Sequence, residues 1–196
     1  MNKELFEEII SNINKNNGLT KKTSERLVNN LIIDKFALDN FVKQLNLIKE
    51  NISICSICNY YEIESKCIIC SDESRNQNVI CVVASQLDVN NIEKINKYKG
   101  LYHILGSEIN LNKKKSPSEI NFENLLSRIG KNSELILALN ATFEGELTTN
   151  YIYQLTKNLN INITRIAKGI PMGGSLDYMD ETTLESAFKN RKKYEV

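Results

Sequence analysis

The feature that most constrains this chain is a paired cysteine pattern near residue 60. Cys55 and Cys58 form one C-x2-C pair, Cys67 and Cys70 form a second, and eight residues separate the pairs. Two residues between cysteines let both sulfurs reach one ion, and two such pairs present four thiolates to a tetrahedral zinc. A disulfide or a set of small buried side chains is the alternative. We expect one structural Zn²⁺, because four thiolates leave no open position for water or substrate.

Composition limits the classes of protein to which the chain can belong. Its 196 residues allow one medium domain or two small ones, and 41% of them are hydrophobic, as in globular proteins. With 25 Lys+Arg against 24 Asp+Glu the net charge is +1, so the chain has no global basic field to hold a polyanion. It has no apolar run of about 20 residues and an acidic start unlike a secretory signal. We expect a cytoplasmic protein with reduced cysteines.

Residues 1–53 are expected to form a helical domain. Apolar residues recur at helical spacing in Leu5–Ile13, Leu27–Ile32 and Phe41–Ile48. Gly18 permits a positive φ in the turn after the first stretch, and Thr20 can cap the helix that follows. The pattern predicts two helices joined by a tight hairpin, with a third helix after them.

The hairpin carries a local excess of positive charge. Residues 15–26 contain three Lys and one Arg against one Glu, a net charge of +3. Lys22 and Arg26 lie four residues apart and therefore share a helix face. The free amides at a helix start also suit a phosphate. Spacing alone leaves two interpretations open, a sequence-independent DNA contact and a solvated helix start.

Residues 78–168 are expected to form a mostly parallel α/β domain. Helical patterns alternate with strand-length apolar runs at Val79–Val83, Leu101–Leu105, Leu135–Leu139 and Ile161–Ala167. Four strands alternating with three helices indicate a parallel sheet covered on both faces. Cys81 and His103 fall inside strand runs and are interpreted as packed residues, and Lys113–Lys115 as a solvated loop tip. A Pro/Gly-rich loop and a short helix from Thr183 close the chain.

In this order and length, the helical hairpin, the four-cysteine insert, the α/β domain and the final loop resemble the bacterial recombination mediators of the RecR family. The segments that carry the resemblance are Gly18–Arg26, the cysteine pairs, Ile80–Val83, Asn140–Glu146 and Thr164–Gly174. The resemblance implies a helix-hairpin-helix domain at 1–53, a zinc finger at 54–72, a Toprim domain at 78–168 and an assembly segment at 169–196. It also implies a ring-like tetramer that acts with RecO and RecF to load RecA on gapped or single-stranded DNA.

The resemblance also assigns site residues. Lys22 and Arg26 match the family's basic DNA-contacting pair, with Lys21 beside them. The family's Leu-Pro, second Gly and second Pro are replaced in this turn by Asn16, Asn17, Thr20 and Lys21, so we expect a less rigid hairpin. For Glu144 and Glu146 the resemblance favours a surface that faces RecO. A weak metal site and a solvated loop are the alternatives for these two acids.

A Toprim enzyme would need carboxylates at two strand ends to hold Mg²⁺. This chain has Ala84 after its first strand and Asn140 after its third, which leaves Glu144 and Glu146 as the only acids expected at that edge. Gly169–Gly174 lacks the Gly-Lys-Ser/Thr ending of a nucleotide loop and is better explained as a tight turn. We therefore expect a non-enzymatic DNA-clamping scaffold. The alternative is a metal-dependent Toprim phosphotransferase, nuclease or primase.

Overall fold

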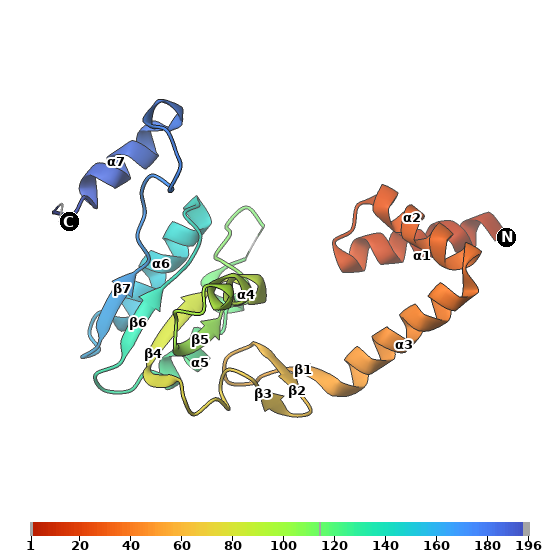
Figure 1. Ribbon diagram of the computed structural model, residues 1–196, viewed down its shortest axis with the longest axis horizontal. Coiled ribbons are helices and arrows are strands. Elements are labelled where there is room, and N and C mark those ends of the chain that lie inside the picture. The colour runs from red at the N-terminus through yellow and green to blue at the C-terminus, as the bar shows by residue number, and fades with distance from the viewer. Residues whose placement is uncertain (1, 114, 194–196) are drawn as a thin grey trace. The chain divides into compact units, whose positions relative to one another are not determined.

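The computed structural model describes residues 2–113 and 115–193 of the chain (Figure 1). It divides into two compact units, Met1–Ser53 and Ile54–Val196. The chain is mixed α/β, with helices first, a cysteine cluster next and a parallel sheet after it, which confirms the expected fold class. Within the described residues, no helix combines the length and the apolar character needed to cross a membrane.

The first unit consists of three helices, α1 (Asn2–Asn17), α2 (Lys21–Ile33) and α3 (Lys35–Asn51), as the apolar spacing predicts. Gly18 takes φ 64° in the turn between α1 and α2. Thr20 caps α2, because its Oγ1 accepts a hydrogen bond from the amide of Thr23 at 3.2 Å. Ile10, Ser24 and Val28 are buried between the first two helices, whereas α3 has no buried residue.

The second unit begins with the cysteine insert. Strands β1 (Ile52–Ile54), β2 (Tyr61–Ile63) and β3 (Lys66–Cys67) form a small sheet in that order, and β2 pairs antiparallel with β3. Glu64 and Ser65 join these two strands with φ of 50° and 63°. Two positive φ values are what a two-residue hairpin turn with the natural strand twist requires. The segment between the cysteine pairs therefore returns as the hairpin that the sequence allowed.

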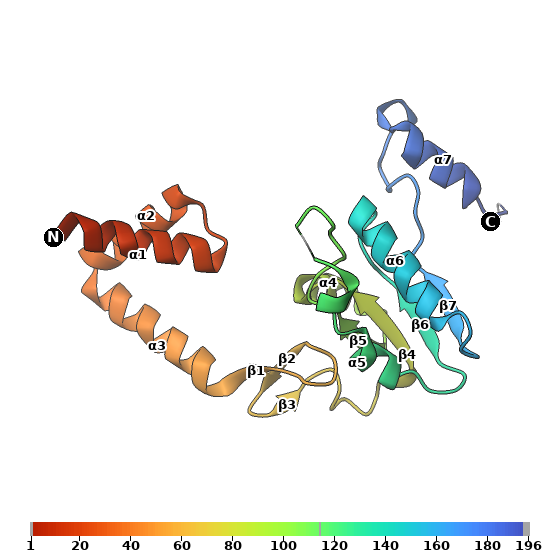
Figure 2. The ribbon, with the colours of Figure 1, turned by 180° about the vertical axis from the view of Figure 1, so that it is seen from behind.

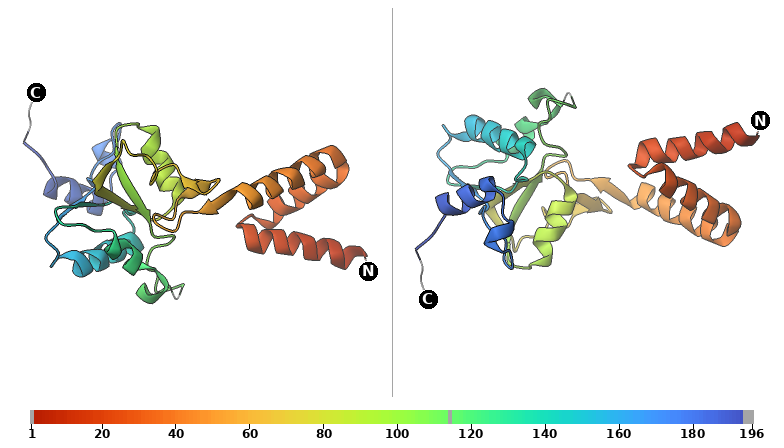
Figure 3. Two further views of the ribbon diagram at one scale, coloured as in Figure 1. Left: turned by 90° about the horizontal axis from the view of Figure 1, so that it is seen from below. Right: turned by 90° about the horizontal axis from the view of Figure 1, so that it is seen from above.

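The larger sheet has four parallel strands in the order β5-β4-β6-β7. Its strands are β4 (Asn76–Val83), β5 (Gly100–Ile104), β6 (Glu134–Leu137) and β7 (Asn162–Arg165). The connecting helices are α4 (Gln86–Lys94), α5 (Phe122–Ser127) and α6 (Phe143–Thr156). Helix α4 covers one face of the sheet, and α5 and α6 cover the other (Figures 2 and 3). The central strand β4 is therefore buried on both sides.

The core of this unit forms around β4 and β5. Ile80, Cys81, Val82 and Val83 are buried in β4, and all of β5 is buried. His103 lies in β5 with its Nδ1 3.1 Å from Nη1 of Arg128. Burial, and then the Arg128 charge, lower the pKa of His103 to about 4, so the imidazole is neutral at physiological pH. Cys81 and His103 are thus packed strand residues, as expected.

After β7 the chain makes a tight turn and a final helix. The amide of Gly174 donates to the carbonyl of Pro171 at 2.9 Å, and Gly173 takes φ 82°. This turn explains the glycines of the segment without a nucleotide. Helix α7 (Glu181–Lys189) follows, and the short helices η1 (Pro117–Glu119) and η2 (Leu176–Tyr178) lie in loops. Lys113 and Lys115 are exposed, and Lys114 lies outside the described residues.

Candidate functional site

The four cysteines of the insert lie together. The Sγ atoms of Cys55, Cys58, Cys67 and Cys70 are all within 4.8 Å of one another, and those of Cys58 and Cys67 are 3.5 Å apart. In a tetrahedral site with bonds of about 2.3 Å, the sulfurs stand about 3.8 Å apart. The cluster therefore fits one metal ion with four thiolate ligands. Within the described residues, no other group of three or more His, Cys, Asp or Glu side chains meets this geometry.

Backbone turns hold the sulfurs in place. In the first pair, the amide of Asn59 donates to the carbonyl of Cys55 at 2.9 Å, and Asn59 itself takes φ 61°. The amide of Tyr60 then points at Cys58 Sγ at 3.4 Å. In the second pair, the amide of Cys70 lies 3.5 Å from the Sγ of its partner cysteine. Amide hydrogens directed at sulfur stabilise the thiolate form that a metal requires.

Without an ion, two thiols of the cluster favour the neutral form. The hydrogen bond with Cys70 and burial raise the pKa of Cys58, and burial raises the pKa of Cys67 to about 11. Four thiolates this close together, three of them buried, would repel one another unless a cation neutralised them. A divalent ion would supply that charge, so metal binding and folding of the insert would be coupled.

The first cysteine turn is fastened to the α/β domain. The amide of Ile104, at the end of β5, donates to the carbonyl of Cys58 at 3.0 Å, and Asn59 Nδ2 donates to the carbonyl of Ile104 at 2.7 Å. Gln86 on α4 donates its Nε2 to the carbonyl of Asn59 at 2.9 Å. Helix α5 contributes Asn124, whose Nδ2 donates to a carbonyl of the same turn at 2.9 Å. The cysteine cluster and the sheet therefore form one packed unit.

The basic residues of the hairpin lie at the start of α2. Lys21, Lys22 and Arg26 are all exposed. Lys22 and Arg26 form no ion pair within the described part of the chain. Lys21 instead lines a cavity of about 500 Å³ between α1 and α2, together with Glu7 and Glu25. The three cations are therefore not equivalent, because only Lys21 is beside carboxylates in that cavity.

The carboxyl edge of the parallel sheet carries more acids than we expected from the sequence. Ala84 and Asn140 follow β4 and β6, so the strand ends lack the carboxylates of a Toprim enzyme. The interpretation of Glu144 and Glu146 as the only acids at this edge was wrong. Glu108, from the loop after β5, accepts hydrogen bonds at its Oε1 from both N and Nδ2 of Asn140, each at 3.0 Å.

The two glutamates around Gly145 belong to the first turn of α6, not to a loop. Glu144 accepts from Asn110 Nδ2 at 3.2 Å. Glu146 forms ion pairs with Arg165 and Lys168 at the end of β7, with the Arg165 Nη1 to Oε2 distance at 2.8 Å. These hydrogen bonds and charges, Arg165 first, lower the pKa of Glu146 to about 2. Its carboxylate is therefore ionised and fixed in position.

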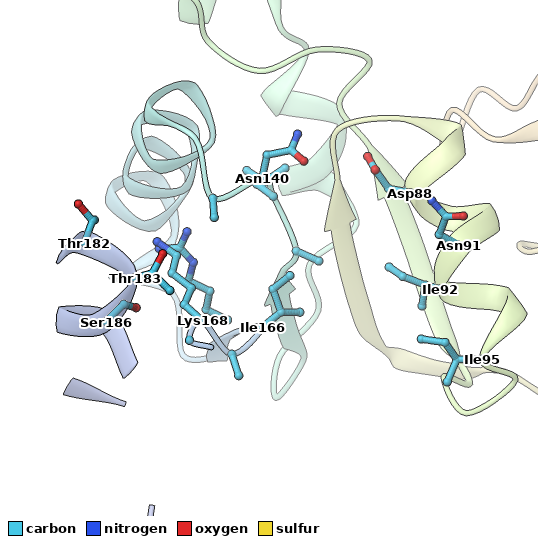
Figure 4. A pocket seen from close by; sticks show the side chains of 16 residues that line it. Asp88, Asn91, Ile92, Ile95, Asn140, Ile166, Lys168, Thr182, Thr183 and Ser186 are labelled. Carbon is cyan, nitrogen blue, oxygen red and sulfur yellow. The ribbon is translucent and has the colours of Figure 1, made fainter. Parts of the chain in front are cut away.

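A cavity of about 700 Å³ lies beside these groups (Figure 4). Asn91 and Ile92 on α4, with Ile95 at its C-cap, line one wall, and Thr183 and Ser186 on α7 line the opposite wall. The ends of β6 and β7 form its floor. Its lining mixes apolar side chains with polar ones. The charged side chains in it are Asp88, whose Oδ2 accepts from the amide and the hydroxyl of Ser85 at 2.8 Å, and the two cations already paired with the α6 glutamate. Among the residues that the structure describes, the cavity therefore offers no free cation to a phosphate.

Sequence reasoning missed Glu108, Arg165 and Lys168 at this edge. Each of them lies near or just after the carboxyl end of a predicted strand of a parallel sheet. Because the carboxyl ends of parallel strands meet at one edge, charged residues after different strands are brought together. That rule would have found Arg165, near the end of the last run, and Lys168, directly after it. The loop of Glu108 has no regular structure from which to place that residue.

Comparisons with known proteins agree with this architecture. The Toprim domain pattern matches residues 78–167, and the pattern of the RecR C-terminal region matches residues 169–192. A Recombination protein RecR of Natranaerobius thermophilus is 39% identical over 179 residues, which cover 90% of either chain. The protein of the same name in Staphylococcus aureus strain MRSA252 is 38% identical over 191 residues, 96% of either chain. The chain therefore belongs to the RecR family.

Proposed function

We propose that this chain is a recombination mediator that binds DNA without a reaction of its own and acts in recombinational DNA repair. The relatives that share 38–39% of its residues are named for recombination. The observation that carries the proposal is the pair of exposed cations in the first two turns of α2, Lys22 and Arg26, which form no ion pair with any residue that the structure describes. Phosphates bind at such places through charge and through free backbone amides, whatever the base sequence.

The hairpin would contact DNA as part of a ring. A net charge near zero gives one chain little attraction for a polyanion, so several copies of Lys21, Lys22 and Arg26 must act together. The support for self-assembly is α3, a helix of 17 residues with no buried residue. Its Phe36 is 82% exposed and its Leu45 is 49% exposed. A helix that exposes this many large apolar side chains needs a partner surface, and we propose that a second copy of the chain covers them.

A second contact between copies would come from residues 169–196. Met172, Tyr178 and Phe188 in this segment expose most of their surface. One contact at the helical domain (1–53) and another at this segment would allow the copies to close into a ring, which we propose to be a tetramer. The zinc finger (54–72) and the Toprim-like domain (78–168) would join the two contacts.

The metal of the cysteine cluster is proposed to be Zn²⁺, one ion per chain, in a structural role. Cys55, Cys58, Cys67 and Cys70 would hold it, and the full sulfur shell leaves no place for a reacting group. The ion would supply folding energy to an insert that is too small to bury a core.

The partner surface is proposed to lie at the start of α6. Phe143 is 74% exposed and precedes Glu144, which is partly exposed, while Glu146 is fixed beside them by its ion pairs. An apolar anchor beside a fixed negative charge suits a protein surface with basic residues. We assign RecO to this surface, with RecF as a further partner in loading RecA on gapped or single-stranded DNA in the cytoplasm.

The DNA proposal is tested by charge reversal. Changing Lys22→Glu together with Arg26→Glu should abolish binding to a fluorescent oligonucleotide, while metal content and the mass in solution stay unchanged. A matched control reverses Lys113 and Lys115, which are exposed in a loop of the other unit. Full binding by the hairpin variant would refute the assignment, and equal loss in both variants would favour diffuse electrostatics.

The enzyme alternative has one observation in its favour, the carboxylates of Glu108 and Glu144 at the sheet edge. Both already accept hydrogen bonds from asparagine amides, at Asn140 and Asn110. A hard cation such as Mg²⁺ prefers several negatively charged oxygen ligands. Two carboxylates that already accept hydrogen bonds from amides are a poor site for it. Primase, nuclease and DNA relaxation assays with Mg²⁺ should therefore be blank. Activity that disappears in Glu108→Gln would support the Toprim enzyme instead.

A further inference from the structure

The amino edge of the parallel sheet, opposite the glutamates, is rich in lysine. Three segments meet the starts of the strands there: residues 94–100 before β5, 129–133 before β6 and 156–162 before β7. Together they contain five lysines and no aspartate or glutamate, in a chain whose net charge is +1. The five are Lys94, Lys97, Lys99, Lys131 and Lys157, and all are exposed.

Backbone hydrogen bonds join these segments into one surface. The amide of Asn76, at the start of β4, donates to the carbonyl of Lys99 at 2.7 Å. On the other side of β4, the amide of Asn162 donates to the carbonyl of Ser133 at 2.9 Å. The first contact joins the segment before β5 to β4, and the second joins the segment before β6 to β7. Because β4 and β6 are neighbours in the sheet, the two contacts lie along one edge. Figure 1 shows the starts of β4, β6 and β7 at the same end of the sheet.

None of the five lysines is in an ion pair within the described part of the chain. Nearby acids are already engaged: Asp72 lies 3.4 Å from Arg75 Nε, Glu93 lies 2.6 Å from Arg75 Nη2, and Glu134 accepts from Thr164. This leaves Glu73 as the exposed carboxylate of the adjoining segment 72–78. The surface therefore has a local excess of positive charge.

Part of this pattern has an ordinary structural explanation. Lys94 lies in the last turn of α4 and Lys157 at the C-cap of α6, where a cation stabilises the helix dipole. That explanation does not extend to Lys97, Lys99 and Lys131, which lie in connecting segments outside any helix. We call these three residues the edge lysines. Asp72 and Glu93 lie near enough to Lys99 to interact with it, but both share Arg75, and the lysines of this edge outnumber the neighbouring acids. The edge lysines therefore need another reason to be gathered here.

We propose that the edge lysines form a second DNA-contacting surface, which binds the phosphate backbone of double-stranded DNA. Asparagines accompany them: Asn96 and Asn132 occupy the turns with φ of 52° and 64°, and their amide groups are further phosphate donors. The proposal rests on the proposed function as a DNA-binding protein. It adds a contact in the α/β domain to that of the hairpin.

The form of the DNA follows from what the surface lacks. Proteins that bind single strands combine positive charge with aromatic rings on which bases stack. The aromatic residue of these three segments is Tyr98, whose hydroxyl donates to the carbonyl of Leu101 at 2.7 Å and whose ring packs against Tyr102. It is committed to the core and presents no stacking platform. Contacts limited to phosphates suit a duplex, in which the bases are already stacked.

The test compares two matched double variants of the full chain, Lys97→Gln with Lys99→Gln and Lys113→Gln with Lys115→Gln. Fluorescence anisotropy measures binding to a duplex and to a single strand of the same sequence between about 50 and 200 mM salt. Each lost duplex phosphate contact lowers the logarithmic salt slope by about 0.9, so the edge variant should lose about 1.8 per chain bound. Adding Lys131→Gln should lower it further, and the control should keep the slope of the unmodified protein.

The outcomes separate this proposal from the one on which it rests. A duplex slope unchanged in the edge variant, with binding still abolished by reversal at Lys22 and Arg26, would overturn the second surface alone. Equal losses in the edge and control variants, or equal losses on duplex and single strand, would also overturn it. An unmodified protein that binds neither DNA would overturn the proposed function itself. Unchanged melting temperature and metal content show that each variant is folded.

Discussion

Gly145 is the position at which a single methyl group should disturb the partner surface. It is the third residue of α6, between Glu144 and Glu146, where the helix starts against the end of β6. A Cβ at this position would meet the carbonyl oxygen of Asn140 at 2.1 Å and its carbonyl carbon at 2.9 Å, with Glu108 Oε1 at 3.0 Å. Two of these three atoms belong to backbone, so neither can rotate away as a flexible side chain could.

Two effects of opposite sign decide the result of Gly145→Ala. Alanine favours a helix over glycine by about 1 kcal/mol. Forcing extra volume into packed structure costs about 1–3 kcal/mol, and contact with rigid backbone places this site at the upper end of that range. The net destabilisation is then about 2 kcal/mol. For a chain of this size that lowers the melting temperature by about 4–8 °C.

Thermal unfolding followed by circular dichroism measures this change. Gly130→Ala is the matched control, because a Cβ there would meet only Ser133 Oγ, at an ordinary 3.5 Å. It should leave the melting temperature nearly unchanged. A Gly145→Ala protein as stable as the unmodified one would refute the close approach of α6 to the strand end.

Two further predictions concern the metal and the α6 ion pairs. Cys67→Ser should reduce bound zinc from one ion per chain to nearly none and lower the solubility or the assembled mass; elemental analysis of protein purified without added metal is the measurement, and a folded, metal-free unmodified protein would contradict the site. The pKa of Glu146 is about 2 against its usual 4.5, so its ion pairs contribute stability above pH 4.5 that is lost as the pH falls towards 2. Because the Glu146 side chain is 36% exposed, solvent screening limits this contribution to about 1 kcal/mol. Urea unfolding should show Glu146→Gln less stable at pH 7 by this amount and equally stable near pH 2, and an equal difference at both pH values would contradict the ion-pair assignment.

The elements of the fold could be predicted because each has a strong local signal. Helical spacing marked the first three helices, and short β-branched runs such as Val79–Val83 marked the strands. The turn at Gly18 and the cap at Thr20 were also recognisable, since each depends on one residue type at one place. The cysteine spacing predicted a cluster that the structure brings within 4.8 Å.

The edge of the sheet could not be predicted to the same degree. Its arrangement depends on loops, and a loop residue such as Glu108 reaches Asn140 across 32 positions of sequence without any periodic signal. Glu146 was recognised as an acid near the edge, but its ionic partners Arg165 and Lys168 come from another strand end. Pairings of this kind arise from tertiary structure, and spacing within one segment carries no information about them.

The attachment of the cysteine turn to the sheet has a consequence for synthesis on the ribosome. The hydrogen bond to the carbonyl of Ser56 comes from Asn124, which is synthesised 68 residues later. The hydrogen bond to the carbonyl of Cys58 comes from Ile104, which is also synthesised later. At about 5–20 residues per second, the turn leaves the ribosome about 3–14 seconds before its last anchor is made. During that interval its sulfurs are exposed to oxidants and to competing metals. An ion captured early would protect them, so the order of synthesis favours metal loading on the nascent chain.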